Sequence, residues 1–384
     1  MRATFTLGRI AGVRIGVHWS VVLIFGIIAF GLAQGRLPHA YPGHAPVVYW
    51  LAGLGAAVVF LASLLAHELA HAVVARRNGV AVDDIVLWLL GGVARLKSEA
   101  SSPGAELRIA GVGPLVSLLT GGLFVLGTWL LALLSAPGLL IEVVAWLAGI
   151  NLLLAVFNAL PAAPLDGGRL LRAFLWWRTG DRLRATAGAT MAGRVLGWLL
   201  VALGLVVFMR GGGFSGLWMA LIGWFLIAAA TAEGRQAHLR GVLAGVPVRD
   251  AMTRDPLTVP AVLTIADLLA DPRYRYRHSA FPVSGVDGAP VGLVTLDGAR
   301  RVTTEKSGTV TVGEVMVPLS QTAIAGPEDS LADLLPRMEP GAEHRVLVMD
   351  EGRLVGILSL SDVSRTLTWL MNPAPRGPHG VGSP

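Results

Sequence analysis

The sequence predicts a multi-pass α-helical membrane protein, with about six transmembrane helices, that continues into a cytoplasmic α/β domain at its C-terminus. Of its 384 residues, 54% are hydrophobic and only 15% are charged, whereas about 25% of the residues in a soluble globular protein are charged. Long apolar runs fill the chain up to residue 235, and beyond it apolar and polar residues alternate as in a soluble domain.

Six apolar stretches are long enough to cross a bilayer, which requires roughly 20 residues of helix. The first stretch follows Arg2, Arg9 and Arg14 and has the pattern of a signal peptide. Because several further apolar stretches come after it, we interpret it as a retained transmembrane helix. The six stretches are residues 17–34, 48–76, 107–134, 139–160, 186–209 and 215–233.

Basic residues are distributed unevenly between the segments that connect these stretches. The net charge of +6 comes from arginines beside the apolar stretches rather than from one patch, which argues against nucleic acid as a partner. Loops rich in Lys and Arg stay in the cytoplasm. We therefore expect an inner-membrane protein whose N- and C-termini are both cytoplasmic. The inside segments then hold Arg2, Arg9, Arg14, Arg76, Arg77, Arg95, Lys97, Arg108, Arg169, Arg172, Arg178, Arg182 and Arg184, and the outside segments hold Arg36 and Arg210.

Residues 245–370 contain an internal repeat, which predicts two copies of one α/β module. Met252 and Met316 are equivalent positions, and each copy has the pattern of a helix, two short apolar strands and a second helix. A tail rich in Pro and Gly follows and is predicted to be disordered. The expected divisions are a transmembrane domain at 1–238, modules at 245–305 and 306–371, and the tail at 372–384.

The second apolar stretch ends in an H-E-x-x-H motif formed by His67, Glu68 and His71. The chain has no cysteine, so a transition metal must be held by histidine and carboxylate. Two histidines at this spacing share one face of a helix and can both reach one zinc ion. Glu68 can then act on a water molecule without ligating the metal. The alternative is a group of polar residues at a helix end that faces the cytoplasmic interface.

A second polar segment, Asn158–Ala173, follows the fourth apolar stretch. Two prolines interrupt the helix there, and two adjacent glycines permit a tight turn that presents Asp166. A catalytic zinc site needs a third protein ligand and an open position, and Asp166 is a candidate for that ligand. Taken alone, Asp166 is better explained as a turn residue that caps the next helix.

Two further segments lie close to these motifs in the sequence. The segment Val80–Lys97 is too short to span, and its β-branched residues around Gly91 and Gly92 predict a strand or hairpin. A strand edge beside a hydrolytic site can hold an extended peptide by strand addition; the alternative is an interfacial loop. We interpret His18 as part of an interfacial anchor with its neighbouring tryptophan, the alternative being a position near the site or the substrate path.

The two polar segments together resemble the site-2 protease family of intramembrane zinc metalloproteases. The shared pattern is H-E-x-x-H in one span and N-x-x-P-x-x-P-L-D-G-G after a later one. The resemblance implies one zinc ion per chain, held by His67, His71 and Asp166. It also implies that Glu68 is catalytic and that Asn158 orients substrate or stabilises the oxyanion. The matching positions are His67, Glu68, His71, Asn158, Pro161, Pro164, Leu165, Asp166, Gly167 and Gly168.

The start of the third apolar stretch, A-G-V-G-P-L-V-S-L-L-T-G-G, also resembles a small-residue packing motif of that family. This resemblance implies that Gly111, Gly113, Gly121 and Gly122 let neighbouring helices approach closely.

The C-terminal repeat resembles a tandem pair of CBS modules, which one subgroup of the family carries. The resemblance implies a homodimer through these modules and an adenine nucleotide bound by a Ser or Thr and an Asp three residues later. The second copy has this pair as Ser359 and Asp362, whereas the first has Thr295 and Asp297, one residue short. We therefore expect at most one working nucleotide site, and the alternative is a purely structural dimerisation module.

The motifs and the two resemblances together imply a zinc-dependent endopeptidase that cleaves transmembrane substrates near the cytoplasmic leaflet, in regulated intramembrane proteolysis. If the CBS pair binds a nucleotide, that binding is expected to regulate the enzyme. Its partners are then the lipid bilayer and a membrane-spanning protein or peptide. One alternative is a CBS-gated transporter or channel with a metal-ion path, but its polar residues would be spread over several spans. Another is a scaffold that holds zinc only for structure, against which Glu68 argues.

Overall fold

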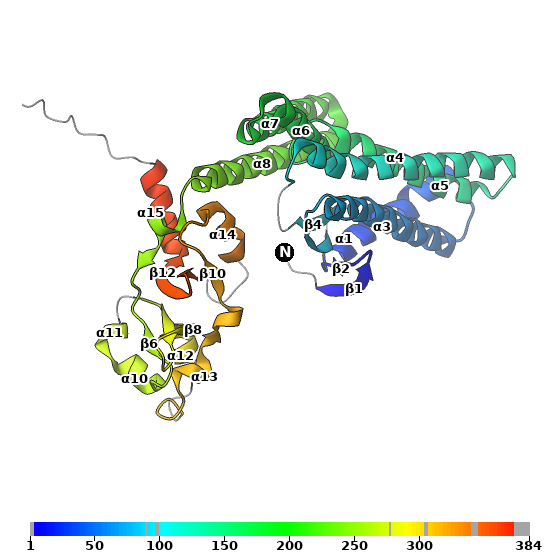
Figure 1. Cartoon of the computed structure of the whole chain (residues 1–384). Coiled ribbons are helices and arrows are strands. Elements are labelled where there is room, and N and C mark those ends of the chain that lie inside the picture. The colour runs from blue at the N-terminus through cyan, green and yellow to red at the C-terminus, as the bar shows by residue number, and fades with distance from the viewer. Residues whose placement is uncertain are drawn as a thin grey trace, which may run out of the picture. The chain divides into compact units, whose positions relative to one another are not determined.

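The computed structural model describes residues 4–88, 91–96, 100–275, 278–302, 306–338 and 345–371. The chain forms two compact units, Met1–Arg235 and Gln236–Pro384 (Figure 1). Some expectations concern residues outside the described ones: the cytoplasmic position of Arg2 and Lys97, and the disorder of the tail at 372–384.

The first unit is built mainly from long apolar helices. Local sequence explains several of their ends: the Ser102 hydroxyl accepts a hydrogen bond from the Ala105 N–H at the start of α4, and Gly180 ends α6 in the left-handed conformation. The helices are α1 (Val21–Phe30), a π-helical turn (Gly31–Arg36), α2 (Leu37–Ala40), α3 (Pro46–Arg77), α4 (Pro103–Leu133), α5 (Gly138–Ala159), α6 (Asp166–Thr179), α7 (Arg182–Val207), a second π-helical turn (Phe208–Gly212) and α8 (Gly213–Ala244).

Five stretches of the described residues are long and apolar enough to cross a membrane: Val21–Ala40, Pro46–Arg77, Pro103–Leu133, Gly138–Ala159 and Arg182–Ala244. The last of these covers 63 residues, far more than the roughly 20 that one crossing needs. It contains both α7 and α8. A Cβ atom at Gly204 of α7 would lie 2.6 Å from the Gly216 carbonyl oxygen of α8, so the two helices pack closely against each other. Six crossings remain a prediction.

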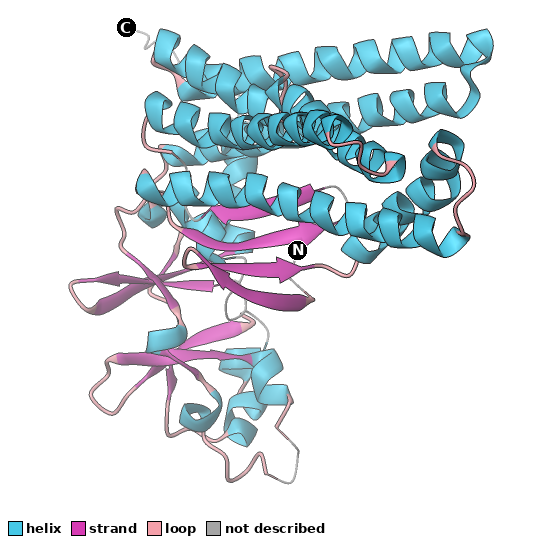
Figure 2. Cartoon of the chain, turned by 90° about the vertical axis from the view of Figure 1, so that its right-hand side faces the viewer, coloured by secondary structure: helices cyan, strands magenta, loops and turns pink. Residues whose placement is uncertain are grey.

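A four-stranded sheet accompanies the helices of the first unit, and Figure 2 shows its strands along one side of the helix layer. The strand order is β1-β2-β3-β4, with β2 parallel to β3 and the outer pairs antiparallel. The antiparallel β3–β4 pair confirms the hairpin expected around Gly91 and Gly92. The strands are β1 (Phe5–Ile10), β2 (Val13–Val17), β3 (Val82–Trp88) and β4 (Gly91–Leu96).

The small-residue motif of α4 serves more than one purpose. A Cβ atom at Gly121 would lie 2.8 Å from the Leu152 side chain of α5, which confirms close helix packing at this position. The same expectation is wrong for Gly122, which has open space around it in the described structure. Gly113 faces two histidine rings rather than a helix backbone.

The second unit contains two sheets that exchange strands between the repeat copies. The sheet orders are β6-β7-β8-β9 and β10-β11-β12-β5, so the short β5 of the first copy joins the sheet of the second copy, and β9 makes the reciprocal exchange. Its remaining elements are α9 (Val248–Ala251), β5 (Thr253–Arg254), β6 (Val259–Pro260), α10 (Ile265–Ala270), α11 (Pro272–Arg275), β7 (Ala280–Ser284), β8 (Pro290–Thr295), α12 (Leu296–Arg300), α13 (Val312–Val315), β9 (Val317–Pro318), a 3-10 turn (Leu319–Gln321), β10 (Ala323–Ala325), α14 (Leu331–Met338), β11 (Arg345–Asp350), β12 (Arg353–Ser359) and α15 (Leu360–Met371).

Candidate metal centre and active site

The two histidines of the H-E-x-x-H motif lie near the C-terminal end of α3 and face the same direction. Their side chains are buried, with exposures of 4% for His67 and 8% for His71. The Nε2 atoms of the two rings are 3.2 Å apart, and the ring centroids are 4.8 Å apart. The helical spacing therefore places both rings at one point, as the sequence predicted.

The Nδ1 atom of each ring makes a hydrogen bond with a group of α4. His71 Nδ1 lies 2.6 Å from the Ile109 carbonyl oxygen, and because a carbonyl only accepts, Nδ1–H is the donor. His67 Nδ1 lies 2.9 Å from the Ser117 hydroxyl oxygen. Such partners fix the orientation of an imidazole and leave Nε2 as its ligating atom.

Asp166 meets the histidines from the N-terminal end of α6. Its Oδ2 atom lies 3.2 Å from His67 Nε2 and 3.1 Å from His71 Nε2. The two glycines that follow it are required by packing, because a Cβ at Gly167 would overlap the Leu160 carbonyl oxygen. The N-terminus of α6 thus packs directly against the chain that leaves α5, and this contact brings Asp166 to α3.

The three side chains form a donor set that suits a divalent metal ion. The ligand atoms of His67, His71 and Asp166 all lie within 4.8 Å of one another. Because His71 Nδ1 donates to the Ile109 carbonyl, Nε2 is the ring atom that can bind an ion together with Asp166 Oδ2. A Cβ at Gly113 would overlap His71 Nε2 and lie 2.7 Å from His67 Nε2. Glycine at this position keeps the space beside the donors open.

Glu68 lies next to this donor set and contacts the sheet. A Cβ at Gly92 of β4 would overlap the Glu68 side chain, and the Gly92 backbone is a hydrogen-bond partner of the Glu68 carboxylate. The positive charge of Arg169, on α6, also acts on Glu68. The glutamate therefore lies beside both the three-donor group and β4, which is an edge strand of its sheet.

The other two residues considered near the site have different surroundings. Asn158 is half-buried in the last turn of α5, shortly before the segment that leads to Asp166. His18 lies between β2 and α1, where its Nδ1 is 2.8 Å from the Ser20 hydroxyl and its ring packs against Trp19. Within the described residues, the three-donor group does not include His18.

Sequence reasoning missed the supporting groups of the site. Ser117, the Ile109 carbonyl and the Gly92 backbone touch site residues from elements that are distant in the chain. Ser117 and Gly113 stand four residues apart within the small-residue motif of α4. The available signal for Ser117 was its spacing, because a residue four positions after Gly113 lies on the same face of the helix.

The residues considered for nucleotide binding lie at the start of α15. The Ser359 hydroxyl donates to Asp362 Oδ2 at 2.6 Å, and the Ser359 N–H donates to the same oxygen at 2.9 Å. Asp362 is only 6% exposed. In the first copy, the Thr295 hydroxyl accepts from the Gly298 N–H at 3.0 Å, so a glycine stands where the second copy has its aspartate. Both hydroxyls therefore sit at helix N-termini, and only the second copy has a carboxylate three residues after its hydroxyl.

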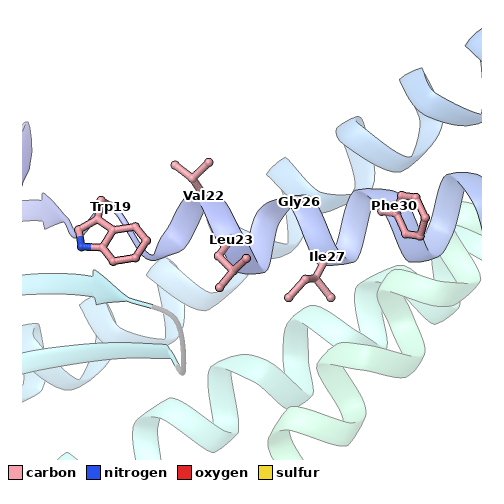
Figure 3. A pocket seen from close by; sticks show the side chains of 6 residues that line it. All are labelled: Trp19, Val22, Leu23, Gly26, Ile27 and Phe30. Atoms are coloured by element: carbon pink, nitrogen blue, oxygen red, sulfur yellow. The ribbon is translucent and has the colours of Figure 1, made fainter.

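A separate apolar groove of about 510 Å³ runs along α1 and contains none of these polar residues (Figure 3). Its lining side chains are apolar, as expected of a helix face that contacts lipid. It is lined by Trp19, Val22, Leu23, Gly26, Ile27 and Phe30.

Comparison with known proteins places both units in described families. Residues 55–135 and 132–203 match peptidase family M50, and residues 248–303 and 312–368 match the CBS domain. A protein of Mycobacterium tuberculosis named zinc metalloprotease Rip3 is 48% identical over 96% of this chain and 93% of its own length. A protein of Synechocystis, also named a zinc metalloprotease, is 31% identical over 96% of both chains. The solved site-2 protease of Methanocaldococcus jannaschii shares 26% identity, over 60% of this chain and 95% of that one, with a TM-score of 0.40.

Proposed function

The chain belongs to peptidase family M50, the site-2 proteases, and is a zinc-dependent intramembrane protease; on this premise we propose that His67, His71 and Asp166 hold the zinc ion. The observation that carries the proposal is the convergence of both Nε2 atoms on Asp166 Oδ2, at 3.2 and 3.1 Å. Three protein ligands and an open position are what a catalytic zinc ion requires. The space that Gly113 leaves beside the rings supports that open position.

Glu68 is the general base and acid in this proposal. When bound, zinc supplies Lewis acidity, which polarises the scissile carbonyl and acidifies a water molecule. Glu68 takes the proton from the attacking water and delivers it to the leaving amine. It is adjacent in sequence to a ligand yet points towards β4, so it can move a proton without occupying a ligand position.

The substrate backbone is held by β4. This strand is an edge of its sheet, and an extended peptide can add to such an edge through main-chain hydrogen bonds. Because Gly92 of β4 touches Glu68, a peptide added there would run past the general base. Asn158 orients the substrate or stabilises the oxyanion by donating a hydrogen bond from its amide.

The membrane arrangement we propose has six crossings in the inner membrane, with both termini in the cytoplasm and cleavage near the cytoplasmic leaflet. Thirteen basic residues in the predicted inside segments, against Arg36 and Arg210 outside, support this orientation. The close packing of α7 against α8 supports counting them as two crossings.

The C-terminal CBS modules, at residues 245–305 and 306–371, form the regulatory and dimerising part in our proposal. An adenine nucleotide binds at Ser359 and Asp362, and the chain forms a homodimer through the same modules. The buried carboxylate of Asp362 and its hydroxyl neighbour support one such site in the second copy. The glycine at position 298 argues against an equivalent site in the first copy.

The decisive test compares wild type with Glu68→Gln on a tagged single-span membrane protein in detergent. We expect wild type to release fragments in a chelator-sensitive manner. Glu68→Gln should lower turnover by about 10²- to 10⁴-fold, the usual contribution of a general acid–base group. Its zinc content, measured by elemental analysis, should stay at one ion per chain.

Glu142→Gln is the matched control for this test. Glu142 lies on α5, and its carboxylate pairs with Arg36 at 2.7 Å, away from the residues assigned to the chemistry. Normal turnover is expected for this variant. Normal turnover by Glu68→Gln would instead refute the assigned mechanism.

A further inference from the structure

A buried ion pair ties α6 to α4 close to the proposed metal site. Glu106, in the first turn of α4, is only 1% exposed. The Arg172 side chain of α6 donates to Glu106 Oε1 from Nε at 2.9 Å and also from Nη2. A second carboxylate, Glu233 of α8, lies 3.6 Å from Arg172 Nη1. Three helices therefore meet at one guanidinium group.

The same two helices carry groups that meet at the histidines. Glu106 stands three residues before Ile109, whose carbonyl accepts from His71 Nδ1. Arg172 stands six residues after Asp166, about 9 Å along the helix axis. About one turn of α4 and fewer than two turns of α6 thus separate the ion pair from the contacts at His71. The ion pair fixes the helix that carries Asp166 against the helix that orients His71.

Apolar packing alone would fix α6 poorly. The buried residues of this helix are the small Gly167, Gly168 and Ala173, which remove little apolar area from water, so polar contacts contribute more to its placement. Asp166 is the first residue of α6, and a small rotation or slide of the helix would move its carboxylate away from both rings. A buried ion pair is costly to form and gives little net stability, so a positional role accounts for it better than a stabilising one.

We propose that Glu106, acting through Arg172, is a positioning residue that holds Asp166 at its place opposite His67 and His71. The proposal rests on the proposed function, because it assumes that these three side chains are the metal ligands. Outer groups that orient metal ligands typically change metal affinity by roughly 10- to 100-fold when they are removed. The inference concerns the metal site itself, so binding and spectroscopy can test it without a substrate.

The experiment uses full-length protein in detergent, with Co²⁺ as the probe ion. Wild type, Glu106→Gln and Glu142→Gln are compared by Co²⁺ affinity, from chelator competition, and by the visible absorption of the Co²⁺ form. We expect Glu106→Gln to lose affinity by about 10- to 100-fold and to show an altered absorption band. The control Glu142→Gln, which breaks the Arg36 ion pair instead, should match wild type.

A second variant covers the case in which Glu106→Gln fails to fold because Arg172 loses its buried carboxylate partner and keeps the more distant Glu233. The double variant Glu106→Gln, Arg172→Met removes both charges, a replacement that buried ion pairs often tolerate. It should fold and show the same altered affinity and band. A folded variant with wild-type affinity and spectrum would overturn the positioning role.

Asp166→Ala separates this inference from the function on which it rests. If Asp166→Ala keeps wild-type Co²⁺ affinity and spectrum, the proposed ligand set is wrong and the positioning role falls with it. If Asp166→Ala loses the ion while Glu106→Gln behaves as wild type, the ligand set stands and only the positioning role is refuted.

Discussion

The cluster at His67, His71 and Asp166 and the cluster at Ser359 and Asp362 both join polar side chains in buried surroundings, but they are assembled differently. The first brings α3 and α6 together across 95 residues of sequence, and a third helix, α4, orients the rings. The second lies within one turn of one helix, three residues apart. Only the first arrangement demands tertiary structure.

This difference determines how strongly each cluster argues for a ligand. A hydroxyl and a carboxylate in the first turn of a helix satisfy backbone N–H groups whether or not a ligand is present. Two buried imidazole nitrogens turned towards the half-buried carboxylate of Asp166 serve no comparable local purpose. The geometry therefore supports a metal at the first cluster on its own, whereas the second is equally consistent with a helix cap.

The largest effect is expected from Asp166→Ala, which removes the ligand that we propose a distant helix contributes. Zinc affinity should fall by more than about 100-fold, because the loss of a ligand exceeds the loss of an orienting group. Elemental analysis of the purified protein checks this directly. About one zinc per chain in wild type and little in the variant is the expected result; full zinc in Asp166→Ala would mean that Asp166 is only a turn residue.

A smaller effect is expected from Gly113→Ala, which leaves every donor in place but fills the space between them. The added methyl group would overlap His71 Nε2. The ring cannot rotate away without breaking the hydrogen bond from Nδ1 to the Ile109 carbonyl. Zinc affinity should fall by roughly 10- to 100-fold. Gly122→Ala, on the same helix in open space, is the matched control and should retain its zinc. Equal zinc affinity in the two variants would contradict the assigned ion position.

The smallest effect is expected from Ser359→Ala in the second cluster. Loss of the helix cap should lower the free energy of unfolding of the second unit by about 1 kcal/mol. Thr295→Ala, which removes the corresponding hydroxyl of the first copy, should have a similar cost.

Nucleotide binding distinguishes these two variants of the CBS modules. AMP, ADP or ATP should raise the thermal stability of wild type and of Thr295→Ala but not that of Ser359→Ala, as linkage requires for a ligand of the folded state. If no nucleotide stabilises wild type, the second cluster is a structural cap and the modules serve dimerisation alone.

Local patterns in the sequence were sufficient for much of this protein. The apolar stretches, the i, i+4 spacing of His67 and His71, the hairpin at Gly91 and Gly92, and the repeat are all visible within short windows, because helix and strand periodicities are local properties. The resemblance to the site-2 proteases, which the comparisons confirm, rests on the same local motifs.

Tertiary structure alone decided how those pieces meet. The sequence shows that Asp166 follows a turn, but its contact with both histidines depends on the packing of Gly167 against the end of α5. The Ile109 carbonyl and the Gly92 backbone have no side-chain signature, so no motif could reveal their roles. The exchange of β5 and β9 between the two sheets was likewise invisible. Contacts between distant segments depend on how whole helices and strands pack, and short-range periodicity in the sequence does not predict that packing.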